Sequence, residues 1–202
     1  MKKYLILLFI IIFNSIICNA QSNTFLEKGK NEMRIGNLQK AIDIFTESIN
    51  KNENITESYF ARGLCYNLLK DYDNSIKDFI NSENLGNKDD KLYTLRGFAY
   101  SQKGKNDLAL NDLDKAILLN ENFNKNYFNR GMLKVRLNKN NDALDDLNYY
   151  LSKVDDPNAY FERGKIYLSI SKKNEACKDF EKSISLGNND EKLMSTQKNN
   201  CN

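Results

Sequence analysis

A pattern of about 34 residues recurs five times along this 202-residue chain and constrains its fold more than any other feature. Each copy places an aromatic residue four positions before a glycine, as in the stretch from Tyr59 to Gly63. The glycines stand at positions 29, 63, 97, 131 and 164, so successive copies are 34, 34, 34 and 33 residues apart. A fixed period of this length is typical of repeat proteins, in which each unit packs only against its neighbours.

The spacing inside each copy predicts two helices joined by a short turn. A small residue follows each glycine by twelve positions, and a large apolar residue comes four positions later. Spacings of three and four residues place side chains on one face of a helix. A glycine inside a helix costs up to about 1 kcal/mol relative to alanine, so its recurrence indicates close helix contact. We expect each glycine to face the small residue of the second helix. The pairs of small and large residues are Ala41 and Phe45, Ser75 and Phe79, Ala109 and Leu113, Ala143 and Leu147, and Ala176 and Phe180.

These offsets of aromatic, glycine, small and large apolar residues resemble those of tetratricopeptide repeat proteins. The resemblance implies an all-α, right-handed α-solenoid with five hairpins across residues 22–189. A capping helix from 190 to about 197 and a frayed tail over 198–202 would complete the chain. The chain departs from the family pattern in having no tryptophan, and in placing Glu32 and Lys134 where other copies have tyrosine. The expected repeat units are 22–55, 56–89, 90–123, 124–156 and 157–189.

An arginine precedes the glycine in four copies, and an aspartate follows that arginine by 16 residues in the same four. The first copy has Lys28 and Ile44 at these positions, so both residues change together. We expect ion pairs that fix the register of the helices; the alternative is a binding site for a charged ligand. The expected pairs are Arg62 with Asp78, Arg96 with Asp112, Arg130 with Asp146, and Arg163 with Asp179.

Residues 1–20 have the order of a secretory signal peptide. Lys2 and Lys3 precede an apolar run over 5–13, and small residues end the segment at Ala20. The run is shorter than the roughly 20 residues that a membrane-spanning helix needs. We expect cleavage after Ala20 and an exported protein, periplasmic or secreted, that contacts the membrane only before cleavage. The alternatives are lipidation of Cys18, where a bulky Ile17 precedes the cysteine, and an uncleaved anchor.

Composition and motifs argue against several classes of function. Without Lys2 and Lys3, the 30 basic side chains fall to 28 against 27 acidic ones, which provides no basic face for nucleic acid. The chain has no histidine, the commonest general base and metal ligand. It also has no C-x-x-C motif and no glycine-rich phosphate-binding motif. We therefore expect no catalysis, no cofactor and no metal.

Three cysteines remain after the expected cleavage site. Cys65 lies among packing residues and is expected to be a buried small hydrophobic residue. An exported chain can keep disulfides, and a bridge from Cys177 to Cys201 would pin the capping helix. The segment around Cys177 with its later tail cysteine also resembles exported bacterial proteins of this family. Two free thiols are the alternative.

In the family, the first helices of the hairpins line a concave groove that binds peptides or helices. The resemblance places an apolar middle with a few polar and basic residues in that groove; the alternative is that its phenylalanines pack between neighbouring first helices. Leu26 and Lys30 occupy the positions at which some family members hold a peptide carboxylate, so that kind of clamp is not supported. The expected groove residues are Phe60, Leu64, Asn67, Thr94, Phe98, Ser101, Gln102, Phe128, Met132, Arg136, Phe161 and Lys165.

The sequence thus predicts a non-catalytic scaffold that binds a protein or peptide partner in its groove. It does not identify the partner or the pathway. The alternative is a self-associating structural module of the cell envelope, in which ends or grooves pack against other copies.

Overall fold

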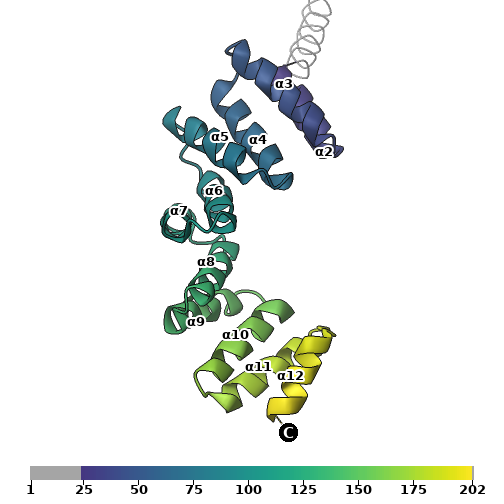
Figure 1. Ribbon diagram of the computed structural model, residues 1–202, viewed down its shortest axis with the longest axis vertical. Helices are drawn as coiled ribbons and strands as arrows, with labels where there is room; N and C mark the ends of the chain where they lie inside the picture. The colour runs from purple at the N-terminus through teal and green to yellow at the C-terminus, as the bar shows by residue number, and fades with distance from the viewer. Residues whose placement is uncertain (1–23, 202) are drawn as a thin grey trace, which may run out of the picture. The chain divides into compact units, whose positions relative to one another are not determined.

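A computed structural model describes residues 24–201, which form eleven helices and no strand (Figure 1). The expected signal peptide, residues 1–20, lies outside this range. Among the described residues, no helix combines the length and the apolar character needed to cross a membrane. The helices are α2 (Phe25–Arg34), α3 (Leu38–Asn50), α4 (Ile55–Leu68), α5 (Tyr72–Asn84), α6 (Asp90–Gln102), α7 (Asn106–Leu119), α8 (Lys125–Arg136), α9 (Asn140–Leu151), α10 (Pro157–Ser169), α11 (Lys173–Ser185) and α12 (Glu191–Cys201).

The chain divides into two compact units, the first ending at Lys103 and the second beginning at Gly104. Unit 1 contains α2 to α6 and unit 2 contains α7 to α12, so the division falls in the turn between α6 and α7. In unit 1, α2 pairs with α3 and α4 with α5; in unit 2, α8 pairs with α9 and α10 with α11 (Figure 1).

Gly29, Gly63 and Gly164 make room for the large aromatic residue of the second helix rather than for the small one. A β-carbon on Gly63 would lie 3.1 Å from Cδ1 of Phe79, and one on Gly164 would lie 2.8 Å from Cδ1 of Phe180. The expectation that the glycine faces the small residue is therefore wrong at Gly63 and Gly164, whereas at Gly131 the carbonyl oxygen of Ala143 would lie 3.4 Å from the β-carbon. The small residue is buried elsewhere in the interface: Ala41 shares a core cluster with Cys65 of the next hairpin. The ring occupies the space that the missing side chain leaves, which explains why alanine does not replace the glycine.

Three of the expected arginine–aspartate pairs are present as two-point ion pairs. Arg62 donates to Asp78 at 2.7 and 2.9 Å, Arg130 to Asp146 at 3.0 and 2.6 Å, and Arg163 to Asp179 at 2.8 and 2.6 Å. The hydrogen bonds that Arg62 donates to Asp78 raise the pKa of Arg62 above its ordinary value. Arg96 and Asp112 belong to different units; within unit 1, Arg96 donates to Glu83 at 2.5 Å.

Each of these three arginines also reaches the second helix of the preceding hairpin. Nη1 of Arg62 donates to Thr46 at 2.8 Å, Nη1 of Arg130 to Asp114 at 2.6 Å, and Nη1 of Arg163 to Asn148 at 2.8 Å. One guanidinium therefore fixes the register inside a hairpin and between two hairpins. Because its donors are used in this way, the arrangement supports packing rather than a site for a charged ligand.

The C-terminal helix is longer than the sequence indicated. The capping helix was expected to end near residue 197 with a frayed tail, but α12 continues to Cys201. Asp190 caps its start by accepting from the backbone N–H groups of Lys192 and Leu193 at 2.9 and 3.1 Å. Cys201 forms a disulfide with Cys177 of α11, with 5.6 Å between their Cα atoms. That bond holds the last turn of α12 in place. The expected end near residue 197 rested on local sequence signals, which do not include this covalent contact.

Candidate functional site

The candidate site is a pocket of about 650 Å³ in unit 1. Its lining comes from α2, from α4 and from the segment that leads from the end of α5 into α6. We call the apolar lining residues Phe60 and Leu64 the floor and the polar and charged lining residues the rim. A concave pocket of this size suits one or two side chains of a bound peptide. It is lined by Lys30, Met33, Thr56, Glu57, Phe60, Ala61, Leu64, Leu85, Gly86, Asn87, Asp89 and Lys91.

The floor of the pocket is apolar because α4 turns Phe60 and Leu64 toward it. These two residues are four apart and therefore lie on one face of the helix. The ring of Phe60 packs against the buried Phe79 of α5, with 5.8 Å between ring centres, so its position is fixed. Met33 of α2 and the 49% exposed Leu85 add apolar surface from either side. The floor therefore presents a hydrophobic contact surface that packing holds in position.

The rim of the pocket carries charges of both signs. Lys30 forms an ion pair with Glu27 at 2.9 Å, and the carboxylate of Asp89 accepts from the backbone N–H of Lys91 at 2.9 Å. Asn87 donates to Ser82 at 3.0 Å. Apolar floors with a few polar groups at the edge are typical of sites that bury a side chain and hydrogen-bond a ligand backbone. The rim provides no single dominant charge.

The predicted groove residues of unit 1 other than Asn67 divide into three groups. Phe60 and Leu64 line the pocket. Phe98 lies outside the pocket and is 44% exposed; its ring meets that of Tyr72 edge to face, with 6.1 Å between ring centres. Ser101 and Gln102, at the end of α6, also lie outside the pocket. Thr94 donates to the carbonyl of Asp90 in its own helix at 3.0 Å.

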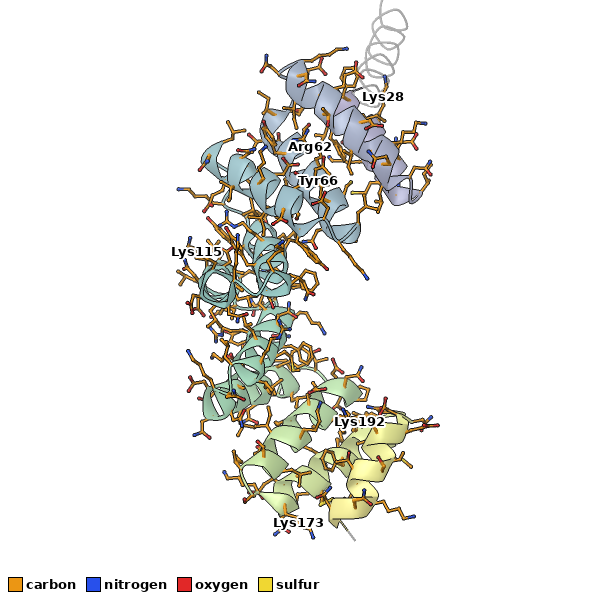
Figure 2. All side chains as sticks on the ribbon, viewed as in Figure 1. Lys28, Arg62, Tyr66, Lys115, Lys173 and Lys192 are labelled. Atoms are coloured by element: carbon orange, nitrogen blue, oxygen red, sulfur yellow. A yellow bond between two sulfur atoms is a disulfide. The ribbon has the colours of Figure 1, made fainter. Side chains whose placement is uncertain are left out.

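Asn67 differs from the prediction. It is buried, and its amide donates to the backbone carbonyl of Leu95 at 3.1 Å, which joins α4 to α6. Its role is therefore to connect two first helices. Arg62 and Tyr66 lie one turn apart on the same helix, and Arg62 forms the ion pair described above (Figure 2).

In unit 2, the predicted residues are mostly used for packing. Phe161 is buried, with its ring 5.8 Å from that of Phe180, so the prediction that it faces a ligand is wrong. Phe128 packs against Tyr150, with 5.2 Å between ring centres. Met132 is half-buried and Arg136 is exposed. Lys165 pairs with Glu162 at 2.6 Å and lies over the ring of Phe161 at 4.9 Å. Lys165 also lines a smaller cavity of about 290 Å³ that extends from α8 to α10.

Sequence reasoning missed several lining residues of the larger pocket, above all Met33, Leu85 and Lys91. The expected groove positions belonged to first helices at fixed offsets from the glycine. Leu85 instead follows the second helix α5, and Lys91 is in the first turn of α6. In the described part of the chain, no cluster of cysteine, aspartate and glutamate side chains has an arrangement suited to a metal ion.

Comparison with known families gives one matching family model, the tetratricopeptide repeat, over residues 56–82, 90–123 and 157–190. Three segments of the chain thus match the tetratricopeptide repeat model. Such repeats generally serve as non-catalytic scaffolds for interactions between proteins. A curated relative, neutrophil cytosol factor 2 of Bos taurus, is 46% identical over 44 residues. That match covers 22% of this chain and only 8% of the relative.

Solved structures resemble the chain over most of its length. MamA has a TM-score of 0.74 at 21% identity, covering 78% of this chain and 92% of that one. YrrB, described as a repeat protein with an unusual peptide-binding site, has a TM-score of 0.77 at 17% identity, covering 92% and 97%. MamA from Desulfovibrio magneticus RS-1 has a TM-score of 0.77 at 14% identity, covering 84% and 97%. These similarities concern the fold, and they confirm the predicted α-solenoid of tetratricopeptide hairpins.

Proposed function

We propose that this chain is an exported, non-catalytic scaffold whose unit 1 pocket binds an apolar segment of a partner protein. The observation that carries the proposal is the apolar floor formed by Phe60 and Leu64 inside a pocket of about 650 Å³. An extended peptide or a helix would place one large apolar side chain on this floor. Its backbone and flanking polar groups would then reach the mixed charges of the rim.

Three observations support a protein ligand over a small polar substrate. The floor is fixed by packing, because Phe60 contacts the buried Phe79. The charges of the rim are of both signs, which suits the alternating donors and acceptors of a polypeptide. A peptide-binding site is also named for YrrB, a protein of the same fold.

The test compares two leucine substitutions on α4. Leu64→Glu places a charge on the floor of the pocket, whereas Leu68→Glu changes a 57% exposed leucine of the same helix that does not line it. Proteins captured from the native envelope by the unaltered chain are identified by mass spectrometry. Binding of the captured partner is then measured by calorimetry with purified components. Loss of binding with Leu64→Glu and retention with Leu68→Glu is the expected result; equal binding by both variants would refute the pocket as the site.

Export is a separate part of the proposal. The order of residues in 1–20 motivates it, and the Cys177–Cys201 disulfide supports it because such bonds persist mainly in oxidising compartments. The intact mass of the protein purified from its native cell is the test. We expect a mature chain that begins at Gln21. A mass that includes residues 1–20, or a lipid on Cys18, would contradict cleavage after Ala20.

A further inference from the structure

The last helix rests on the repeats through very little apolar surface. Leu193 is the buried residue of α12, and it joins a core cluster with Phe161, Ala176 and Phe180 of the last hairpin. Much of the rest of the helix is polar and exposed, including Lys192, which is labelled in Figure 2. A helix of 11 residues is only marginally stable alone in water. Leu193 and the partly buried Cys201 are the α12 residues in contact with this cluster, so α12 depends on few apolar contacts.

The disulfide provides the second point of attachment. Leu193 lies near the start of α12, whereas Cys201 is its last residue and is bonded to Cys177 of α11. Because the bridge closes a sequence separation of 24 residues, it removes much of the freedom that α12 would gain on undocking. The helix is thus held by packing at one end and covalently at the other.

The hairpin beneath α12 is held together by independent contacts. Arg163 pairs with Asp179 through two hydrogen bonds of 2.8 and 2.6 Å. The hydroxyl of Ser183 donates to the carbonyl of Pro157 at 2.6 Å. None of these bonds involves a residue of α12, so α10 and α11 remain paired when α12 leaves.

We infer that the Cys177–Cys201 bridge is a redox latch: oxidised, it keeps α12 docked, and reduced by a dithiol, it lets α12 undock. Undocking exposes Phe161, Ala176 and Phe180, which α12 otherwise helps to cover through Leu193. The state of one bond therefore decides whether the last hairpin ends in a polar or an apolar surface.

The chemistry requires an external dithiol reductant. One thiolate of the reductant attacks a bridge sulfur, which forms a mixed disulfide and releases the other cysteine as a thiolate. The second thiol of the reductant then attacks the mixed disulfide. The protein gains two electrons and two protons as a pair of thiols, and the reductant becomes a disulfide. Both bridge cysteines are partly exposed, so the reductant can reach them.

Cys65 takes no part in this exchange. It is fully buried, and burial raises the pKa of its thiol to about 11. Little thiolate therefore exists at neutral pH, and the thiolate is the form that attacks disulfides.

Hydrogen exchange of the full-length protein tests the latch, measured with and without dithiothreitol. We expect exchange of the α12 amides to accelerate on the order of 100-fold on reduction, from the loss of loop closure. Amides of α10 and α11 should change little. The double variant Cys177→Ser/Cys201→Ser, measured without reductant, should match the reduced protein, which separates the bridge from other effects of the reagent.

Two results would overturn the inference. Unchanged protection of α12 on reduction would show that Leu193 alone holds the helix. Equal acceleration throughout α10, α11 and α12 would show that the bridge stabilises the whole hairpin rather than latching one helix. Trypsin provides an independent measure, because Lys192 and Lys198 lie in α12 and should be cut faster only after reduction.

Discussion

The first and the last hairpins close their ends of the repeat array in different ways. Interior first helices bury residues two positions after the repeat glycine, such as Cys65 and Leu133. The corresponding residue of α2 is Asn31, which is exposed. Glu27 likewise stands where α4 has the buried Ala61. The first hairpin therefore ends in polar side chains, whereas the last one ends in an added helix, α12.

The polar end of the first hairpin is formed by residues of the hairpin itself and is always present. The polar end of the last hairpin is present only while α12 stays docked. This difference also bears on self-association. Because both ends are polar in the oxidised protein, stacking of copies end to end is disfavoured. Light scattering that shows a stable oligomer under oxidising conditions would contradict this conclusion.

The largest expected effect comes from the ion pair that the last hairpin has and the first lacks. Asp179→Ala leaves the guanidinium of Arg163 in a largely buried site without its partner carboxylate, since Asp179 is 5% exposed. We expect a loss of about 3–5 kcal/mol in the free energy of unfolding, measured by urea denaturation. The matched change in the first hairpin, Ile44→Ala, removes a half-buried side chain and should cost about 1 kcal/mol. Equal losses of unfolding free energy in Asp179→Ala and Ile44→Ala would contradict a special stabilising role for the ion pair between Arg163 and Asp179.

A second test uses the repeat glycine, which is Gly29 in the first hairpin and Gly164 in the last. A β-carbon would lie 2.7 Å from Cδ1 of Phe45 in Gly29→Ala and 2.8 Å from Cδ1 of Phe180 in Gly164→Ala. We expect each substitution to lower the melting temperature, with a net loss of about 1–3 kcal/mol, because the ring must move. Gly131→Ala is the control with more space, since the nearest atom is 3.2 Å away. A smaller loss at Gly29 and Gly164 than at Gly131 would contradict close packing of the rings.

Equivalent serines provide a third and smaller test. Ser48 donates to the carbonyl of Glu53 at 2.6 Å, and Ser183 donates to that of Pro157 at the same distance. Both serines are fully buried, so Ser48→Ala and Ser183→Ala should each cost about 1–2 kcal/mol in chemical denaturation. The bonds of Ser183 lie within the last hairpin, whereas Ser48 also accepts from Ser58 of the next one at 2.8 Å. Only Ser48→Ala should therefore speed amide exchange at the start of α4.

The smallest expected effect is a gain in an interior hairpin. The hydroxyl of Ser75 is buried without a hydrogen-bond partner, at the position where the other copies have alanine. Ser75→Ala should stabilise the protein by about 0.5–1 kcal/mol, seen as a higher midpoint of denaturation. A lower midpoint would reveal a hydrogen bond that this hydroxyl makes in solution.

The sequence predicted the helical hairpins well because their determinants repeat. Five copies of the same spacing act as an internal alignment, so covariation of Arg62 with Asp78 and of Lys28 with Ile44 was visible without any relative. Contacts that depend on three-dimensional packing were less accessible. The offset from the glycine did not reveal that Phe79, rather than Ser75, fills the space beside Gly63.

The candidate site was only partly predictable for a related reason. Offsets on the first helices found Phe60 and Leu64, but the pocket also needs Leu85, which follows a second helix. The same rule included Asn67 and Phe161, which are buried. A linear rule does not distinguish a side chain that points into a groove from one that supports the neighbouring helix.

The arginines have a consequence for how such a chain can change in length. Each one bonds an aspartate of its own hairpin and an oxygen acceptor of the hairpin before it, and those earlier acceptors differ: Thr46, Asp114 and Asn148. The inter-hairpin bond therefore accepts a hydroxyl, a carboxylate or an amide. The second hairpin has Ile80 at the equivalent position, and Arg96, which follows it, donates to Glu83 instead. Gain or loss of a whole hairpin is therefore tolerated most easily where the preceding hairpin supplies an oxygen at this position.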